Sequence, residues 1–131
     1  MHSIRAASSG ELGSLQAIRA EVLPEASASL LEYCVTGPPV ALTTRAPTEG
    51  IVGYVIAIRD RQEKAAQLVS LTIVPSARRE GHGRALVDAV VARLADHDRL
   101  HLLTPADNTA AVEFYETLGF ERDGRLDGFY I

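Results

Sequence analysis

The most constraining feature of the chain is an apolar, β-branched run that leads through a glycine-containing turn into a helical pattern. The run covers residues 68–74 and is typical of a buried strand. The turn contains Gly81 and Gly83, and apolar residues then recur at helical spacing from Ala85 to Leu94. A strand–turn–helix unit directs several backbone N–H groups and the positive end of a helix dipole to one place. The sequence therefore predicts a binding site for a phosphate or another anion.

The residues around the two glycines exclude two familiar phosphate loops. A P-loop ends in Gly-Lys-Ser/Thr, whereas Gly83 is followed by Arg84 and Ala85. A dinucleotide fingerprint requires glycine or alanine three positions after the second glycine, and Leu86 stands there. The remaining pattern is Arg-x-x-Gly-x-Gly, which begins at Arg78.

A second segment, residues 108–120, reads Asn-Thr-Ala-Ala-Val-Glu-Phe-Tyr-Glu-Thr-Leu-Gly-Phe. On a helix, Asn108 and Tyr115 share one face with Ala111. Together the two segments resemble the motifs of the GNAT superfamily of N-acetyltransferases. Its coenzyme A signature is Gln/Arg-x-x-Gly-x-Gly/Ala, and its second motif is a helix that begins with Asn and ends in Tyr-x-x-Leu-Gly-Phe. The resemblance covers residues 50–130 specifically and the N-terminal elements more loosely.

This resemblance implies one GNAT domain over residues 1–131. The expected α/β fold has a mixed, splayed sheet flanked by about four helices, with a short or missing C-terminal strand. Acetyl-CoA is the implied co-substrate. A signature strand would pair with its pantetheine arm, the loop would hold its pyrophosphate, and Asn108 would bind a pantetheine amide. The expected cofactor-binding residues are Leu71, Thr72, Ile73, Arg78, Arg79, Gly81, His82, Gly83, Arg84, Asn108 and Tyr115.

The implied reaction is direct attack of an amine on the thioester. A backbone amide of the signature strand would polarise the thioester carbonyl, and Tyr115 is the expected catalytic acid for the departing thiolate. Some relatives place a glutamate base where Leu103 stands, and the two central strands contain no carboxylate. The base therefore stays open among side chains on these strands and elsewhere: Ser70, Thr72, His101, Thr104, Glu21, Glu25 and Glu32.

The acceptor and the partners also stay open. The C-terminal segment looks most like the branch that acetylates protein N-termini, ribosomal ones included, whereas the missing glutamate argues against that branch. The acceptor is then a peptide N-terminus, a lysine or a small amine. A second hypothesis is a non-catalytic module that binds or senses acyl-CoA. A third is a subunit of a toxin or transfer complex, and an open sheet edge favours a homodimer.

Composition excludes several other classes. The formal net charge of −4 does not favour an extended nucleic-acid partner. No apolar run is long enough to cross a membrane, and no signal peptide is visible. Cys34 is a single cysteine, and the four histidines lack metal-ligand spacing, so we expect no disulfide and no metal. The expected location is the cytoplasm.

The remaining elements follow from periodicity and breakers. Ser8 and Glu11 have the spacing of a capping box, and Pro24 should end the helix that they begin. Residues 40–74 should form an antiparallel meander, followed by a parallel crossover through the next helix. The expected strands cover residues 3–7, 40–44, 51–58, 65–74, 100–104 and 120 onward. The expected helices cover 8–23, 25–34, 83–95 and 108–118.

Overall fold

The protein is described by a computed structural model that covers residues 3–22, 24, 28–36, 40–46, 50–60, 65–94, 99–102, 104–105, 109–121, 125–126 and 129–130. Its helices are α1 (Leu12–Val22), α2 (Ala28–Thr36), α3 (His82–Arg93) and α4 (Thr109–Thr117), with short 3-10 turns at Ser9–Glu11 and Pro75–Ala77. Its strands are β1 (Ser3–Ala6), β2 (Val40–Ala46), β3 (Gly50–Asp60), β4 (Ala65–Ile73), β5 (Arg99–Leu102), β6 (Thr104–Pro105), β7 (Arg125–Leu126) and β8 (Phe129–Tyr130).

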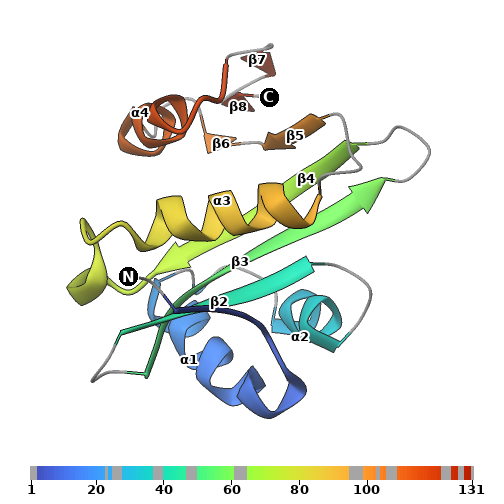
Figure 1. Ribbon diagram of the computed structural model, residues 1–131, viewed down its shortest axis with the longest axis vertical. Coiled ribbons are helices and arrows are strands. Elements are labelled where there is room, and N and C mark those ends of the chain that lie inside the picture. Colours follow the sequence, from blue (N-terminus) through green and yellow to red (C-terminus); the bar gives the residue numbers. More distant parts are fainter. Residues whose placement is uncertain are drawn as a thin grey trace.

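The main sheet has five strands in the order β1-β2-β3-β4-β5 (Figure 1). The pairs β1–β2, β2–β3 and β3–β4 are antiparallel, and β4–β5 is parallel. The predicted meander and the predicted parallel crossover through α3 are therefore confirmed.

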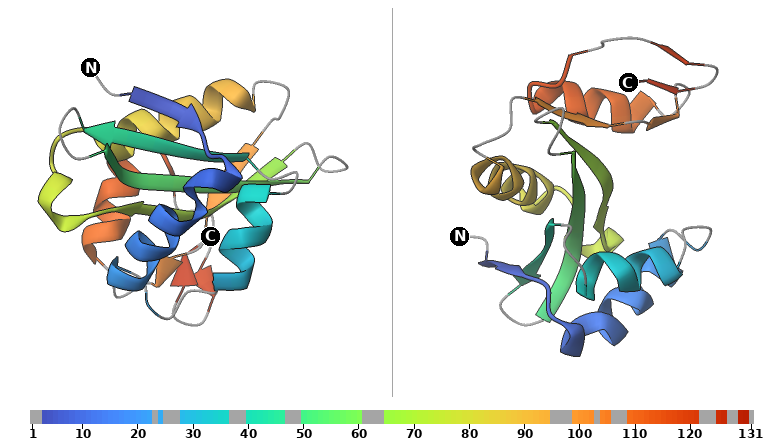
Figure 2. Two further views of the ribbon diagram at one scale, coloured as in Figure 1. Left: turned by 90° about the horizontal axis from the view of Figure 1, so that it is seen from below. Right: turned by 90° about the vertical axis from the view of Figure 1, so that its right-hand side faces the viewer.

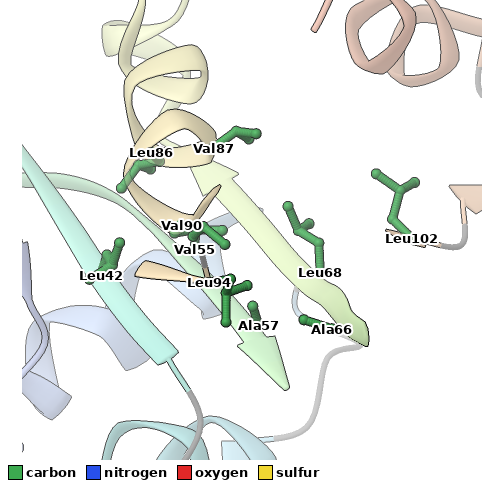
Figure 3. Packing of buried hydrophobic residues seen from close by; sticks show 10 residues of the cluster. All are labelled: Leu42, Val55, Ala57, Ala66, Leu68, Leu86, Val87, Val90, Leu94 and Leu102. Carbon is green, nitrogen blue, oxygen red and sulfur yellow. The ribbon is translucent and has the colours of Figure 1, made fainter. Parts of the chain in front are cut away.

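Helices cover both faces of this sheet, with α3 on one face and α1 and α2 on the other (Figure 2). The α3 face buries one cluster, shown in Figure 3: Leu42, Val55, Ala57, Ala66, Leu68, Leu86, Val87, Val90, Leu94 and Leu102. The α1 and α2 face buries a second cluster: Leu15, Ile18, Leu31, Cys34, Val35, Ala41, Tyr54 and Ile56. The central strand β3 contributes to both clusters, which explains why its sequence is apolar at successive positions.

The start of the first helical segment follows the predicted capping box. The backbone N–H of Ser8 donates to Oε1 of Glu11 over 3.0 Å, so a donor that the helix itself leaves unpaired is satisfied. Glu11 also forms an ion pair with Arg45 on β2, which ties this helix start to the sheet. The α-helix ends at Val22, before Pro24, as predicted.

The region after α3 differs from the prediction. We expected one strand over residues 100–104, but β5 ends at Leu102 and the next strand, β6, belongs to a second sheet. That sheet has the order β6-β8-β7, with all described pairs antiparallel. Phe120 was predicted to begin the last strand, but it precedes β7. The C-terminal strand is therefore short rather than missing, because Phe129 and Tyr130 pair with β6.

Candidate functional site

The site begins at an irregularity in β4. Ile56 of β3 pairs with Ser70 and Ala57 pairs with Leu68, so Val69 is an extra residue without a partner on β3. A bulge of this kind bends a strand and reverses the alternation of its side chains. Ala66 and Leu68 face the α3 cluster before the bulge, and Leu71 and Ile73 face it afterwards.

Pairing between β4 and β5 stops at the same point. The last pair is Leu68 with Leu102, and no described strand pairs with residues 69–73 on this side. Val74 donates its N–H to Val52 on β3 over 2.9 Å. Because backbone groups alternate along a strand, Thr72 also directs its N–H and C=O toward β3. Leu71 and Ile73 direct theirs the other way, and we call that side of residues 69–73 the open edge of β4.

Arg78 binds the end of the open edge. Its Nε donates to the carbonyl oxygen of Ile73 over 3.1 Å. The first arginine of the Arg-x-x-Gly-x-Gly pattern therefore orients the loop relative to β4. This bond uses the carbonyl oxygen of Ile73. The N–H and C=O groups of Leu71 take no part in it.

The glycine loop leads directly into the start of α3. Arg79 and Gly81 have positive φ angles of 66° and 86°, and Gly81 is the N-cap of the helix. The N–H of Ala85 donates to the carbonyl of Gly81 over 3.0 Å. The N–H groups of Gly83 and Arg84 precede this bond and have no acceptor within the helix. N–H groups at a helix start suit an anion, which is the kind of ligand that the sequence predicts here.

The same helix start contacts α4. Nη2 of Arg84 donates to the carbonyl oxygen of Thr117 over 3.1 Å. A Cβ atom at Gly83 would lie 2.9 Å from Cζ of Phe114. Glycine at position 83 therefore allows close packing of α3 against α4.

His82 differs from its neighbours in the loop. Arg79, Glu80 and Gly81 are exposed, whereas the His82 side chain is buried. Its Nδ1 lies 2.7 Å from Oγ1 of Thr44 on β2. The side chain therefore points into the protein.

Tyr115 lies on α4, half-buried beside the α3 cluster that Leu71 and Ile73 also contact. Its ring packs edge-on against Phe120, with centroids 5.8 Å apart. Burial raises the pKa of the Tyr115 hydroxyl above its ordinary value. The phenol therefore stays protonated at neutral pH and can act as a proton donor.

Three candidate bases lie on the opposite face of the sheet. Ser70 and Thr72 alternate with the residues that face α3, and their hydroxyl oxygens are 3.2 Å apart. His101 is opposite Gln67 in the β4–β5 register. His101 is exposed. Its neighbour Leu102 faces the α3 cluster, so His101 lies on the other face of the sheet, as Ser70 and Thr72 do.

Several predicted residues have no structural description. Asn108, Leu103 and Glu25 lie outside the described residues, and of Thr104 only the strand position is described. Glu21 and Glu32 are exposed on α1 and α2.

Among the described residues, the remaining polar side chains indicate neither a metal site nor a reactive thiol. The described part of the chain holds no group of three His, Cys, Asp or Glu side chains placed to bind a metal ion. Cys34 is buried, and burial raises the pKa of its thiol, so the reactive thiolate is disfavoured. Among the described helices, none has the length and apolarity to cross a membrane.

The structure adds three residues that sequence reasoning missed. The switch of apolar spacing between Leu68 and Leu71 was a usable signal for the bulge at Val69. Thr44 and Phe114 had no such signal, because their partners His82 and Gly83 are far away in the sequence.

The fold is that of an α/β protein in which a mixed sheet opens beside the start of α3. A family model described as the acetyltransferase (GNAT) family matches residues 14–120. The chain therefore belongs to the GNAT acetyltransferase family.

Solved structures of GNAT proteins share the fold. A ribosomal-protein-alanine N-acetyltransferase from Escherichia coli superposes with a TM-score of 0.82 at 21% identity, covering 99% of this chain and 88% of the other. NAA60 of Arabidopsis thaliana in complex with acetyl-CoA gives 0.82 at 21% identity, covering 100% and 90%. The PaiA N-acetyltransferase from Thermoplasma acidophilum in complex with coenzyme A gives 0.80 at 15% identity, covering 99% and 96%.

Proposed function

We propose that the protein transfers the acetyl group of acetyl-CoA to an amine by direct attack. The observation that carries this proposal is the open edge of β4 next to the start of α3. An open strand edge offers N–H and C=O groups to an amide-containing chain, and a helix start offers N–H groups to a phosphate. The pantetheine arm and the pyrophosphate of acetyl-CoA supply these two chemistries in one molecule.

The proposed reaction makes one bond and breaks one. The neutral amine nitrogen attacks the thioester carbonyl carbon, and the N–H of Leu71 or Ile73 stabilises the developing negative charge on its oxygen. The C–S bond then breaks, and the coenzyme A thiolate takes a proton from Tyr115. The products are an amide and free coenzyme A, after the acceptor nitrogen has lost one proton.

The proton from the acceptor requires a base, and three candidates lie on the face of the sheet opposite α3. Ser70 and Thr72 are neutral hydroxyls, so they can pass a proton on but hold one poorly. His101 is exposed on the same face and belongs to the residue type that accepts protons near neutral pH. We therefore place His101 first among the candidate bases.

The acceptor class follows only in outline. The structural neighbours include an enzyme for a ribosomal-protein alanine, NAA60 and an aminoglycoside N-acetyltransferase, so they support a peptide N-terminus and a small amine alike. Cytoplasmic location and a homodimer stay predictions. The homodimer was expected because the C-terminal strand could be missing. The short strand β8 is present, so it weakens that reason for a dimer.

One observation favours a second candidate, a module that binds acyl-CoA without turnover. The described residues of β4 and β5 include no carboxylate, and Leu103 stands at the glutamate position of some relatives.

An acetylation assay distinguishes the two functions. Incubation with acetyl-labelled acetyl-CoA and a panel of peptides, lysine and polyamines should label at least one amine. Binding of acetyl-CoA without any labelling would favour the module.

Replacing Arg79 by glutamine should weaken acetyl-CoA binding about tenfold, the effect of losing one charge-assisted hydrogen bond to a phosphate. Arg79 is exposed in the loop, so its removal leaves the core intact. Arg93→Gln at the far end of α3 removes the same charge and should leave the dissociation constant unchanged. Calorimetric titration of both variants checks this. Equal weakening in both would point to long-range charge rather than a loop contact.

A further inference from the structure

The buried imidazole of His82 connects two distant parts of the chain. The His82 side chain is 5% exposed. Its Nδ1 lies 2.7 Å from Oγ1 of Thr44, and its Nε2 lies 3.5 Å from a carboxylate oxygen of Glu80. Both ring nitrogens therefore have a polar neighbour, one on β2 and one in the glycine loop.

The order carboxylate–imidazole–hydroxyl resembles a nucleophilic triad, but the burial of Thr44 excludes that role. Thr44 is 0% exposed, so no substrate carbonyl can reach its hydroxyl without unfolding of the sheet. The contacts link the loop residue Glu80 to β2 through the His82 ring.

The contacts also indicate which ring nitrogen carries the proton. A carboxylate only accepts hydrogen bonds, so Glu80 favours a hydrogen on Nε2. In the tautomer with its hydrogen on Nε2, Nδ1 accepts the hydrogen of the Thr44 hydroxyl. The bond is directional, and it determines how His82 sits on β2.

His82 is the first residue of α3 and is flanked by Gly81 and Gly83. Glycines on both sides give the backbone little conformational preference of its own. The buried side-chain bond to β2 is therefore one of the contacts that hold the first turn of α3 and its N–H groups in place.

We propose that His82 is a positioning residue for the pyrophosphate of acetyl-CoA, and that it acts through its bond to Thr44 rather than by touching the ligand. This inference rests on the proposed function, because it concerns the same loop. The bond holds the N–H groups of the helix start in place before the ligand arrives, which lowers the ordering cost of binding.

Two adjacent threonines provide a matched test. Thr43 and Thr44 are both 0% exposed, but they face opposite sides of β2. The Thr44 hydroxyl binds His82, whereas the Thr43 hydroxyl has no hydrogen-bond partner among the described residues. Thr44→Val should raise the dissociation constant of acetyl-CoA about five- to tenfold. Thr43→Val should leave it unchanged, and Thr44→Ser should restore the wild-type value.

A truncated thioester separates positioning from general damage. S-acetylpantetheine has the thioester and the pantetheine amides but no pyrophosphate. In steady-state assays, Thr44→Val should raise KM for acetyl-CoA with kcat unchanged, and should leave KM for S-acetylpantetheine at the wild-type value. Nitrogen-15 NMR of the His82 ring should show Nδ1 as a hydrogen-bonded acceptor in wild type and in Thr43→Val, and a changed Nδ1 signal in Thr44→Val.

The outcomes separate this inference from the proposed function. If wild type binds acetyl-CoA and both valine variants bind it as tightly as wild type does, the role of His82 is wrong, and the proposed function is not affected. Equal weakening of both thioesters in Thr44→Val would also overturn the role. If wild type does not bind acetyl-CoA, both proposals fail. Should Thr44→Val not fold, His82→Leu removes the same bond and is measured in the same way.

Discussion

Replacing Tyr115 by phenylalanine should lower kcat for acetyl transfer by about 10²-fold or more, the usual contribution of general acid catalysis. The change removes one hydroxyl and keeps the ring that packs against Phe120. The dissociation constant of acetyl-CoA should therefore stay close to the wild-type value. Stopped-flow or steady-state assays with a labelled acceptor, together with calorimetric binding, measure both quantities.

Tyr33→Phe is the matched control. Tyr33 is 55% exposed on α2. The substitution therefore removes the same hydroxyl group at a position away from the loop and the open edge. Its kcat should not change. A wild-type kcat in Tyr115→Phe would show that the thiolate leaves without this proton and would remove Tyr115 from the mechanism.

The pH dependence gives an independent check on Tyr115. A general acid is active only while it is protonated, and burial raises the pKa of the Tyr115 hydroxyl. Loss of kcat by deprotonation of Tyr115 should therefore begin only above about pH 10, the ordinary tyrosine value. The folded state also favours the neutral form of Tyr115. Ionisation of Tyr115 therefore lowers the stability of the fold only as the pH rises past about 10. An alkaline limb near pH 8 that survives in Tyr115→Phe belongs to another group.

Replacing Leu86 by alanine should lower the free energy of unfolding by about 2–5 kcal/mol, the range for a leucine lost from a well-packed core. Leu86 is 0% exposed and lies in the cluster between α3 and the sheet (Figure 3). It is also one helical turn after His82, on the same face of α3. The change should therefore weaken acetyl-CoA binding as well, because the start of α3 packs less firmly on the sheet.

Val91→Ala in the same helix is the control for Leu86→Ala. Val91 is 53% exposed, so its loss should change the free energy of unfolding by no more than about 0.5 kcal/mol. Urea unfolding followed by circular dichroism compares the two variants. Equal stabilities would mean that α3 does not pack on the sheet through its Leu86 face.

Local sequence patterns predicted the elements that lead to the site. The β-branched run before the loop formed β4, and Gly81 took the left-handed conformation at the start of α3. The capping box at Ser8 and Glu11 and the stop before Pro24 are equally local, because each depends on neighbours within one turn. The family resemblance carried by Arg78, Gly81, Gly83 and residues 108–120 is confirmed by the match over residues 14–120.

The division of the C-terminal half into two sheets was beyond such patterns. A single apolar run near residue 100 reads as one strand, but Leu102 and Thr104 belong to different sheets. Which edge a strand pairs with depends on where the other edges lie, and the pairing of β4 with β5 ends next to the bulge at Val69. A bulge shifts the strand register by one residue. The β-propensities of the residues are almost the same in either register, so they do not predict the shift.

The sequence by itself determined the strand, the glycine loop, the helix that follows and the class of ligand that they suit. These features depend on backbone preferences and on spacing within a few residues. Only the tertiary structure decided that Leu71 and Ile73, and not Thr72, direct their backbone groups to the open edge. Only it turned His82 inward to Thr44 and placed Phe114 against Gly83. Those contacts join residues more than thirty positions apart, and packing of the whole sheet is what brings them together.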